Sequence, residues 1–203
     1  MEVNKISEKI NSSPSCILLF SGKRKSGKDY ITDIILERIK RENAVMLKIS
    51  APIKSYWAET HDLQFDDLMG AGEYKEKYRQ DMIKWSEGVR RQNYGYFCEA
   101  AVKMFKAHEK PIWIVSDIRR KTDLKWFKEN YGSAVKTIRV VADEGIRKQR
   151  GWIFTEGVDD AETECDLDDV LEWDWKIINN SNESELEKQI QDILSAIENI
   201  MHL

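Results

Sequence analysis

The chain has 203 residues, of which 41% are hydrophobic and 33% are charged, and its formal net charge is −4. This length suits a single domain with a buried core, and the slightly negative charge excludes a general attraction to nucleic acids or membrane surfaces. The three cysteines, Cys16, Cys98 and Cys165, form no closely spaced pair, so the sequence indicates neither a structural zinc site nor a disulfide framework.

Short apolar runs alternate with stretches in which apolar residues recur at helical spacing. In the first half, the patterns predict a strand at 16–21, a helix at 30–39, a strand at 44–49 and helices at 53–60, 73–91 and 96–107. In the second half, they predict a strand at 111–116, a helix at 122–131, a strand at 135–142, a helix at 143–150, a strand at 174–178 and a final helix at 186–200. This alternation predicts an α/β fold with a central parallel sheet covered by helices on both faces.

The segment 156–169 stands apart in composition, because eight of its residues are Asp or Glu. Runs of like charge usually stay in water, where they are hydrated and repel one another least. We therefore expect a solvated acidic loop here.

Residues 22–28 (GKRKSGK) match the first seven positions of the phosphate-loop pattern G-x-x-x-x-G-K-[ST]. They lie between a predicted strand and a predicted helix, which is the context that such a loop requires. In these loops, backbone N–H groups and the helix N-terminus hold a phosphate chain, and the lysine, here Lys28, reaches the β- and γ-phosphates. The alternative is a glycine turn with solvated lysines, which does not explain why Lys23, Arg24 and Lys25 follow an apolar strand directly. This excess of cations predicts a second anion at the site.

Two acidic residues are candidates for a magnesium site. Asp29 stands where the pattern usually has Ser or Thr, and it either contacts Mg²⁺ or stabilises the helix N-terminus as an ordinary first-turn acid. Asp117 closes the predicted strand 111–116, where an acid in nucleotide-loop proteins holds the metal through its water shell.

Arg119 and Arg120 follow Asp117 at the carboxyl end of that strand, the edge at which α/β sheets bind ligands. Arginine suits two-point contacts with phosphate or carboxylate; the alternative is a pair of surface arginines bound to Asp123 or Glu129. Two more clusters of basic residues are interpreted as ordinary charged helix faces, unless the fold brings them over the same cleft as Arg119 and Arg120. They are Arg79, Lys84, Arg90 and Arg91, and Arg147, Lys148 and Arg150.

None of the three histidines lies in a stretch that predicts acid–base catalysis; His61, His108 and His202 are all in polar surroundings. A phosphate acceptor has its second pKa near about 6 and is already anionic at neutral pH. Transfer to such an acceptor needs no general base. It needs cations that neutralise two approaching anions and align them, so the sequence predicts a phosphorylated acceptor.

These residues also carry a resemblance to a known family. The stretches LLFSGKRKSGKDY, YKEKYRQDMIKW, PIWIVSDIRR, WFKENYG, IRVVADEGIRKQRGW and GVDDAETECDLD resemble those of the animal-type phosphomevalonate kinases. That family belongs to the nucleoside-monophosphate-kinase-like group of P-loop folds, and its loop has Asp at the position of Asp29. The resemblance implies an ATP- and Mg²⁺-dependent enzyme that phosphorylates mevalonate 5-phosphate, in the mevalonate route to isoprenoids and sterols. The carboxylate and phosphate of that acceptor suit the excess of cations.

The resemblance also implies roles for individual residues. ATP-binding roles are implied for Gly22, Lys23, Arg24, Lys25, Ser26, Gly27, Lys28, Asp29, Arg147, Arg150 and Asn180. Acceptor-binding roles are implied for Lys54, Arg79, Arg90, Arg119, Arg120 and Asn179. Catalytic roles are implied for Lys28, Asp117, Arg119 and Arg120, and metal binding for Asp29 and Asp117. We expect one P-loop kinase domain over 1–203, with a helical lid at about 143–165.

Two other functions stay open at this point. One is a kinase for another small phosphorylated acceptor, such as a nucleoside monophosphate, with Tyr56, Trp57 and Trp85 available to bind a base. The other is a nucleotide-binding module without transfer activity, which the presence of Lys28, Asp117 and Arg119 disfavours.

The sequence predicts neither export nor membrane insertion. No apolar run approaches the roughly 20 residues of a membrane span, and the first fifteen residues lack the apolar core of a secretory signal. The last three residues, Met201-His202-Leu203, only faintly resemble a peroxisomal S-K-L ending. We expect a cytosolic monomer that binds small molecules, with the peroxisome as the weaker alternative for its location.

Overall fold

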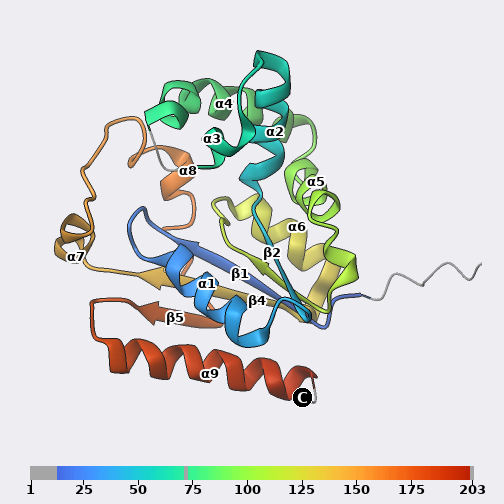
Figure 1. Cartoon of the computed structure of the whole chain (residues 1–203), viewed down its shortest axis with the longest axis vertical. Coiled ribbons are helices and arrows are strands. Elements are labelled where there is room, and N and C mark those ends of the chain that lie inside the picture. Colours follow the sequence, from blue (N-terminus) through green and yellow to red (C-terminus); the bar gives the residue numbers. More distant parts are fainter. Residues whose placement is uncertain (1–12, 71–72, 202–203) are drawn as a thin grey trace, which may run out of the picture.

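The computed structural model describes residues 13–70 and 73–201. The chain's first residues and its last two, on which the targeting expectations depend, lie outside those ranges. The centre of the molecule is a five-stranded sheet with the strand order β2-β3-β1-β4-β5 (Figure 1). All neighbouring strands are parallel. The strands are β1 (Cys16–Gly22), β2 (Ala44–Leu47), β3 (Ile112–Val115), β4 (Val135–Val141) and β5 (Trp175–Ile178).

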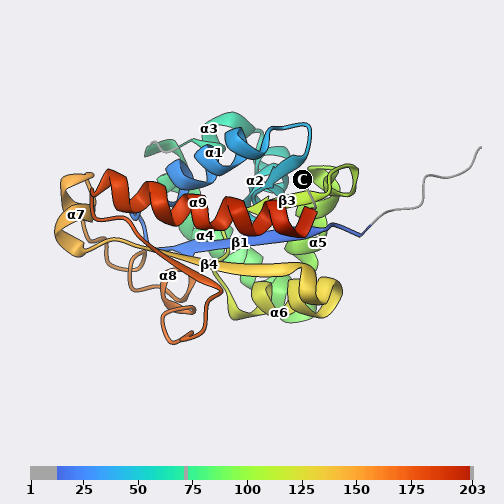
Figure 2. The same ribbon diagram turned by 90° about the horizontal axis from the view of Figure 1, so that it is seen from below.

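Helices cover both faces of the sheet, as the sequence predicted (Figure 2). The longer elements are α1 (Lys28–Ile39), α2 (Ser50–His61), α4 (Glu73–Gln92), α5 (Tyr96–Met104), α6 (Lys121–Tyr131) and α9 (Glu183–Met201). The shorter elements are α3 (Phe65–Met69), η1 (Ala107–Glu109), η2 (Gly132–Ala134), α7 (Glu144–Gln149) and α8 (Glu162–Cys165).

Side chains alternate across β1 and thereby build two separate cores. Leu18 and Phe20 pack with residues of α1 and α9 on one face. Ile17 and Leu19 pack with residues of α5 and α6 on the other face. Because both faces of β1 are buried, the strand reads as a continuous apolar run, which is the pattern that predicted it.

The expected strands are all present, and the differences concern element ends and the short helices α3, α8, η1 and η2. Helix α2 begins at Ser50, before Pro52, so the strand expected at 44–49 ends at Leu47. Helices α3 and α8 were not predicted, because five and four residues are too few to establish a helical period. In the described part of the chain, no helix combines the length and apolar character needed to cross a membrane.

The parallel arrangement brings the carboxyl ends of the strands to one edge of the sheet. The register pairs Leu19 of β1 with Val115 of β3, and Gly22 of β1 with Val140 of β4. The loops after β1, β3 and β4 therefore start side by side, at the edge where α/β sheets bind ligands.

Candidate active site

The loop between β1 and α1 has the backbone that a phosphate loop needs. Gly27, the residue before α1, has φ 88°, in the left-handed region that favours glycine. A Cβ there would lie 2.2 Å from Asn179 Nδ2, and a Cβ on Gly22 would lie 2.8 Å from the Val140 carbonyl oxygen. Both glycines are therefore required by close packing, and the N-terminus of α1 faces the loop.

Lys28 ties this loop to the end of β3. Its Nζ donates to the Ser116 carbonyl oxygen at 2.5 Å and to Asp29 Oδ1 at 2.8 Å. Desolvation raises the pKa of Asp29, but Lys28, Lys48 and Arg119 outweigh this effect, and the pKa lies below its ordinary value. Asp29 is therefore an anion at neutral pH, and its side chain is largely exposed to the site.

The carboxylate of Asp117 connects two elements of the site. It accepts hydrogen bonds from the backbone N–H groups of Ile49, at 2.6 Å, and Ser50, at 3.0 Å. These amides stand at the start of α2, so Asp117 fixes that helix against the end of β3. In the described residues, no group of three or more His, Cys, Asp or Glu could hold a metal ion. Mg²⁺ is often held by one or two carboxylates and substrate phosphates, which is what Asp29 and Asp117 offer at this edge.

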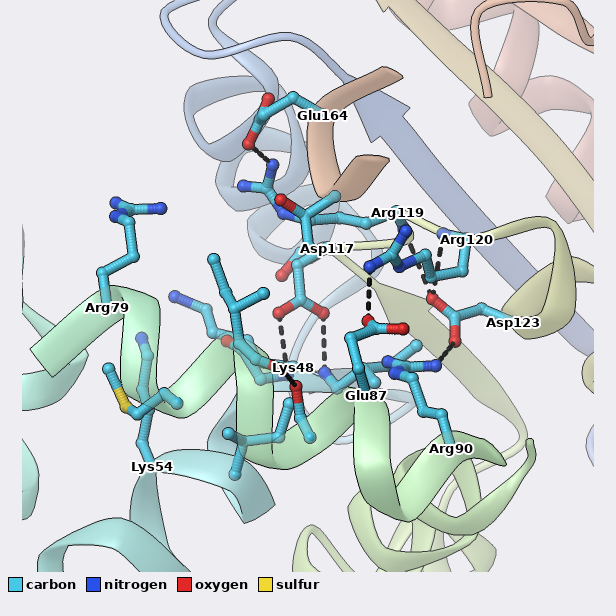
Figure 3. Close-up of a pocket in the computed structure, with 18 of the residues that line it drawn as sticks. Lys48, Lys54, Arg79, Glu87, Arg90, Asp117, Arg119, Arg120, Asp123 and Glu164 are labelled. Carbon is cyan, nitrogen blue, oxygen red and sulfur yellow. Dashed lines mark hydrogen bonds and ion pairs between the residues drawn. The ribbon is translucent and has the colours of Figure 1, made fainter. Parts of the chain in front are cut away.

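A cavity of about 220 Å³ lies beside Lys28 and Asp117 (Figure 3). Its cations come from several elements. They are Lys28 of α1, Lys48 after β2, Lys54 of α2, Arg79 and Arg90 of α4, and Arg119 and Arg120 after β3. The fold thus brings Arg79 and Arg90 to the same cleft as Arg119 and Arg120. Arg79 and Arg90 are therefore more than an ordinary charged helix face. Lys84 and Arg91 do not line the cavity among the described residues.

Each of three arginines in the cavity has an acidic partner. Arg90 Nη1 lies 2.6 Å from Asp123 Oδ1. Arg120 pairs with Glu87 and, at 3.2 Å, with Glu162. Arg119 pairs with Glu164. Desolvation lowers the pKa of Arg119, and the like charges of Arg79 and Arg24 add to that effect.

These ion pairs contradict the reading of Arg119 and Arg120 as surface arginines bound to Asp123 or Glu129. Arg120 is buried, and Asp123 accepts the backbone N–H groups of both residues, not their guanidinium groups. Glu129 lies outside the cavity, where it contacts Lys125 and Tyr94.

The solvated acidic loop expected at 156–169 is wrong in part. The side chains of Asp159 and Glu164 are only 7% and 3% exposed. Asp159 binds Arg24 at 2.9 Å, and Asp168 binds Lys23 at 2.5 Å. These acids leave water because the fold gives them cationic partners, which local composition cannot show. The segment is therefore attached to the phosphate loop and, through Glu164, to the cavity.

The two arginines expected in a lid also reach the phosphate loop. Arg147 Nη1 lies 3.4 Å from the Arg24 carbonyl oxygen, and its guanidinium group lies 4.1 Å from the centre of the Trp152 ring. Arg150 donates to the carbonyl oxygens of Ser26, at 3.1 Å, and Asn179, at 2.9 Å. Neither arginine lines the cavity.

The two asparagines after β5 occupy different positions. Asn179 is buried and donates to the Ser26 carbonyl oxygen at 2.9 Å. It supports the phosphate loop and does not line the cavity, so its position does not match the acceptor-binding role that the resemblance implied. Asn180 instead pairs with the backbone and side chain of Asp143 before α7.

Sequence reasoning missed several residues that line the cavity. Lys48 stands directly after β2, at the same sheet edge as Asp117, so the rule that identified Asp117 applies to it as well. Glu87, Asp123 and Glu164 carried no such signal, because their importance follows from the arginines that they meet in space.

Comparison with known proteins identifies the family of the chain and relates its fold to a solved structure. A family model described as phosphomevalonate kinase matches residues 20–133. A phosphomevalonate kinase of Drosophila melanogaster is 46% identical over 180 residues, which cover 88% of this chain and 94% of that protein. The crystal structure of TT1252 from Thermus thermophilus covers 91% of this chain and 98% of its own, with 15% identity and a TM-score of 0.52. That structural likeness bears on the fold alone.

Proposed function

The chain belongs to the phosphomevalonate kinase family, and we propose that it transfers the γ-phosphate of ATP to mevalonate 5-phosphate. The products are mevalonate 5-diphosphate and ADP. One observation in the structure supports this most directly. A phosphate loop opens beside a small cavity that, among the described residues, is lined by seven cationic side chains from several elements. An acceptor that carries both a phosphate and a carboxylate suits such a cavity.

The geometry also bears on the competing acceptor. Tyr56 stacks on Trp85 with ring centres 4.1 Å apart, and Trp57 is buried against Trp85 and His61. None of the described residues that line the cavity is aromatic. A nucleoside monophosphate would have no ring on which to stack its base, so the cavity favours a small aliphatic acceptor.

The chemistry assigned to the protein's residues is electrostatic. An acceptor phosphate oxygen bonds to the γ-phosphorus as the bond from that phosphorus to ADP breaks. Little covalent chemistry is left for the enzyme, so positioning and charge neutralisation dominate. Lys28, on the phosphate loop, is suited to the transferring group, while Arg119 stands between loop and cavity. The transfer needs no general base, because the acceptor oxygen is already anionic.

Asp29 and Asp117 are the residues that would hold Mg²⁺. Asp29 offers an exposed anionic carboxylate in the first turn of α1. Both oxygens of Asp117 already accept backbone N–H groups, so its contact with a metal would run through its remaining lone pairs or a water. A bound Mg²⁺ supplies charge neutralisation between the phosphates.

The segment 143–165 is suited to act as a lid over the ATP phosphates. Arg147 and Arg150 extend from it to the carbonyl groups of the phosphate loop. Gly151 and Gly157 have φ values of 78° and 75°, and the open space around Gly151 leaves room for rotation. These glycines are candidate hinges.

A single assay tests the substrate assignment. ADP release is followed with ATP, Mg²⁺ and one acceptor at a time: mevalonate 5-phosphate, mevalonate, AMP or GMP. We expect turnover with mevalonate 5-phosphate at least 100-fold above each of the others, roughly 2.7 kcal/mol in transition-state discrimination. Equal turnover with AMP or GMP would show that the acceptor is wrong. ATP binding without turnover on any acceptor would favour the inactive module.

A further inference from the structure

Asp123 lines the cavity beside Arg90 and Arg120, and no role follows for it from the transfer chemistry. It stands in the first turn of α6, and its side chain is only 1% exposed. Its two carboxylate oxygens face two different elements (Figure 3). Such a buried carboxylate is stable only when its oxygens are matched by donors.

One oxygen of Asp123 holds the side chain of Arg90. Oδ1 accepts from Arg90 Nη1 at 2.6 Å and from Cys98 Sγ at 3.7 Å. The Arg90 guanidinium group also lies 5.4 Å from the centre of the Phe97 ring. Desolvation acts to lower the pKa of Arg90, but Asp123 outweighs it and the pKa is raised. Arg90 is therefore a fixed cation at the wall of the cavity.

The other oxygen holds the backbone of the turn between β3 and α6. Oδ2 accepts from Arg120 N at 3.2 Å and weakly from Arg119 N at 3.4 Å. A first-turn acid commonly caps its own helix in this way. Capping accounts for one oxygen only; it does not require the second oxygen to bind an arginine from α4.

We propose that Asp123 is a positioning residue that fixes Arg90, on α4, relative to Arg119 and Arg120, on the β3–α6 turn. These arginines stand on different elements, and their separation decides whether one small dianion can contact them together. The inference rests on the proposed function, because it assigns the three arginines to the acceptor. Asp123 itself acts through them and does not contact the acceptor.

The test is Asp123→Asn, which keeps the size of the side chain and removes its charge. An amide has one acceptor oxygen, so it satisfies Arg90 or the turn, but not both. We expect the KM for mevalonate 5-phosphate to rise at least tenfold, while the Kd for ATP measured without acceptor changes less than twofold. Equal changes in both constants, or an unchanged acceptor KM in a folded protein, would overturn the proposal.

Asp174→Asn is the matched control. Asp174 also accepts a backbone N–H and a hydroxyl, both from Thr137 at 2.8 Å, but it lies before β5 and outside the cavity. We expect both constants of this variant to stay within twofold of the unchanged enzyme. Failure of the proposed function would be seen in the unchanged enzyme, as an absence of turnover with mevalonate 5-phosphate. Failure of the Asp123 inference would be seen only in the variants, against an unchanged enzyme that is active.

A second pair of variants covers the case in which Asp123→Asn does not fold, since it leaves Arg90 buried without a counter-charge. Arg90→Gln is compared with the double variant Arg90→Gln and Asp123→Asn, which has no lone buried charge. If Asp123 also positions the β3–α6 turn through its backbone N–H groups, the acceptor KM of the double variant should be a further threefold or more higher. The Kd for ATP should be unchanged. Equal acceptor KM values in the two would show that Asp123 has no effect on the turn.

Discussion

The ammonium nitrogen of Lys28 lies 2.5 Å from the carbonyl oxygen of Ser116, so the phosphate loop and the end of β3 are joined by one side chain. Ser116 is followed by Asp117 and Arg119, which line the cavity proposed to bind the acceptor. Lys28 therefore stands where the two halves of the site meet, with its side chain only 11% exposed. At such a position, the ammonium group can stabilise charge that develops between donor and acceptor.

Replacing Lys28 by Met should abolish most of the turnover and leave the fold intact. Loss of one preorganised charge contact to a transferring group costs on the order of 10²–10³ in kcat. The measurement is ADP release, with the melting temperature and the Kd for ATP recorded in parallel. Lys103→Met, an exposed lysine on α5 paired with Glu99, is the control and should keep full activity. A Lys28→Met enzyme within about tenfold of the unchanged rate, roughly 1.4 kcal/mol, would exclude this role.

The phosphate loop and the acceptor cavity differ in how far the sequence foretold them. Gly22, Gly27 and Lys28 lie on one strand–loop–helix unit, and Asp117 ends a second strand, so local pattern and the edge rule were enough. Arg79 and Arg90 were assigned to the acceptor only through the family resemblance, because they lie on α4, whose docking against the sheet depends on contacts distant in sequence. Glu164 of α8 was misread for the same reason, because its burial is explained only by its contact with Arg119.

Arg119 and Arg120 should serve the acceptor more than ATP. We expect Arg119→Met and Arg120→Met each to raise the KM for mevalonate 5-phosphate at least tenfold, with a smaller change in the Kd for ATP measured alone. Arg120→Met should also lower the melting temperature, since it leaves Glu87 partly buried without its partner. Arg38→Met is the control. It removes an arginine in the last turn of α1 that pairs with Glu187 of α9, outside the cavity, and it should affect neither constant. Equal losses on both substrates would assign the two arginines to the nucleotide half.

Glu164 forms an ion pair with Arg119, an arginine that the acceptor is expected to bind. Its carboxylate binds Arg119 in the cavity, so an incoming anion competes with it. Glu164→Gln should therefore lower the KM for mevalonate 5-phosphate, by about threefold or more, because the ion pair with Arg119 is exchanged for a weaker hydrogen bond to a neutral amide. Asp169→Asn, an exposed acid paired with Lys121 outside the cavity, is the control. A higher KM for the Glu164 variant would mean that Glu164 supports the cavity instead.

The pH dependence should follow the acceptor and not the enzyme. The pKa of Asp29 is lowered from the ordinary Asp value, which is itself about 4, so its carboxylate stays ionised as the pH falls from about 8 to about 5. The second pKa of the acceptor phosphate is near about 6, so kcat/KM should fall below that pH with a slope of one proton. At higher pH, we expect a plateau. A bell-shaped profile with an enzyme pKa of about 7 would reveal a general base.

The lid hypothesis makes a prediction about rate and a prediction about motion. Arg150 contacts the carbonyl oxygens of Ser26 and Asn179, and closure of its segment would expel water from around the transferring phosphate. Arg150→Met should then lower kcat at least tenfold, with less effect on acceptor KM, and raise the share of ATP that is hydrolysed. Lys148→Met is the matched control, because Lys148 lies two residues before Arg150, in α7, but pairs with Glu144 in solvent.

Motion of the lid is measured by hydrogen exchange. Backbone amides from 143 to 165 should exchange more slowly when ATP and mevalonate 5-phosphate are both bound than with either alone, since both halves of the site contact this segment. Arg24 reaches Asp159 and Lys23 reaches the Glu164 carbonyl oxygen, while Arg119 reaches the Glu164 carboxylate. Amides of α9, which packs on the opposite face of the sheet, serve as the internal reference. If exchange across 143–165 is the same with and without both ligands, the segment does not close, even if Arg150 proves essential for turnover.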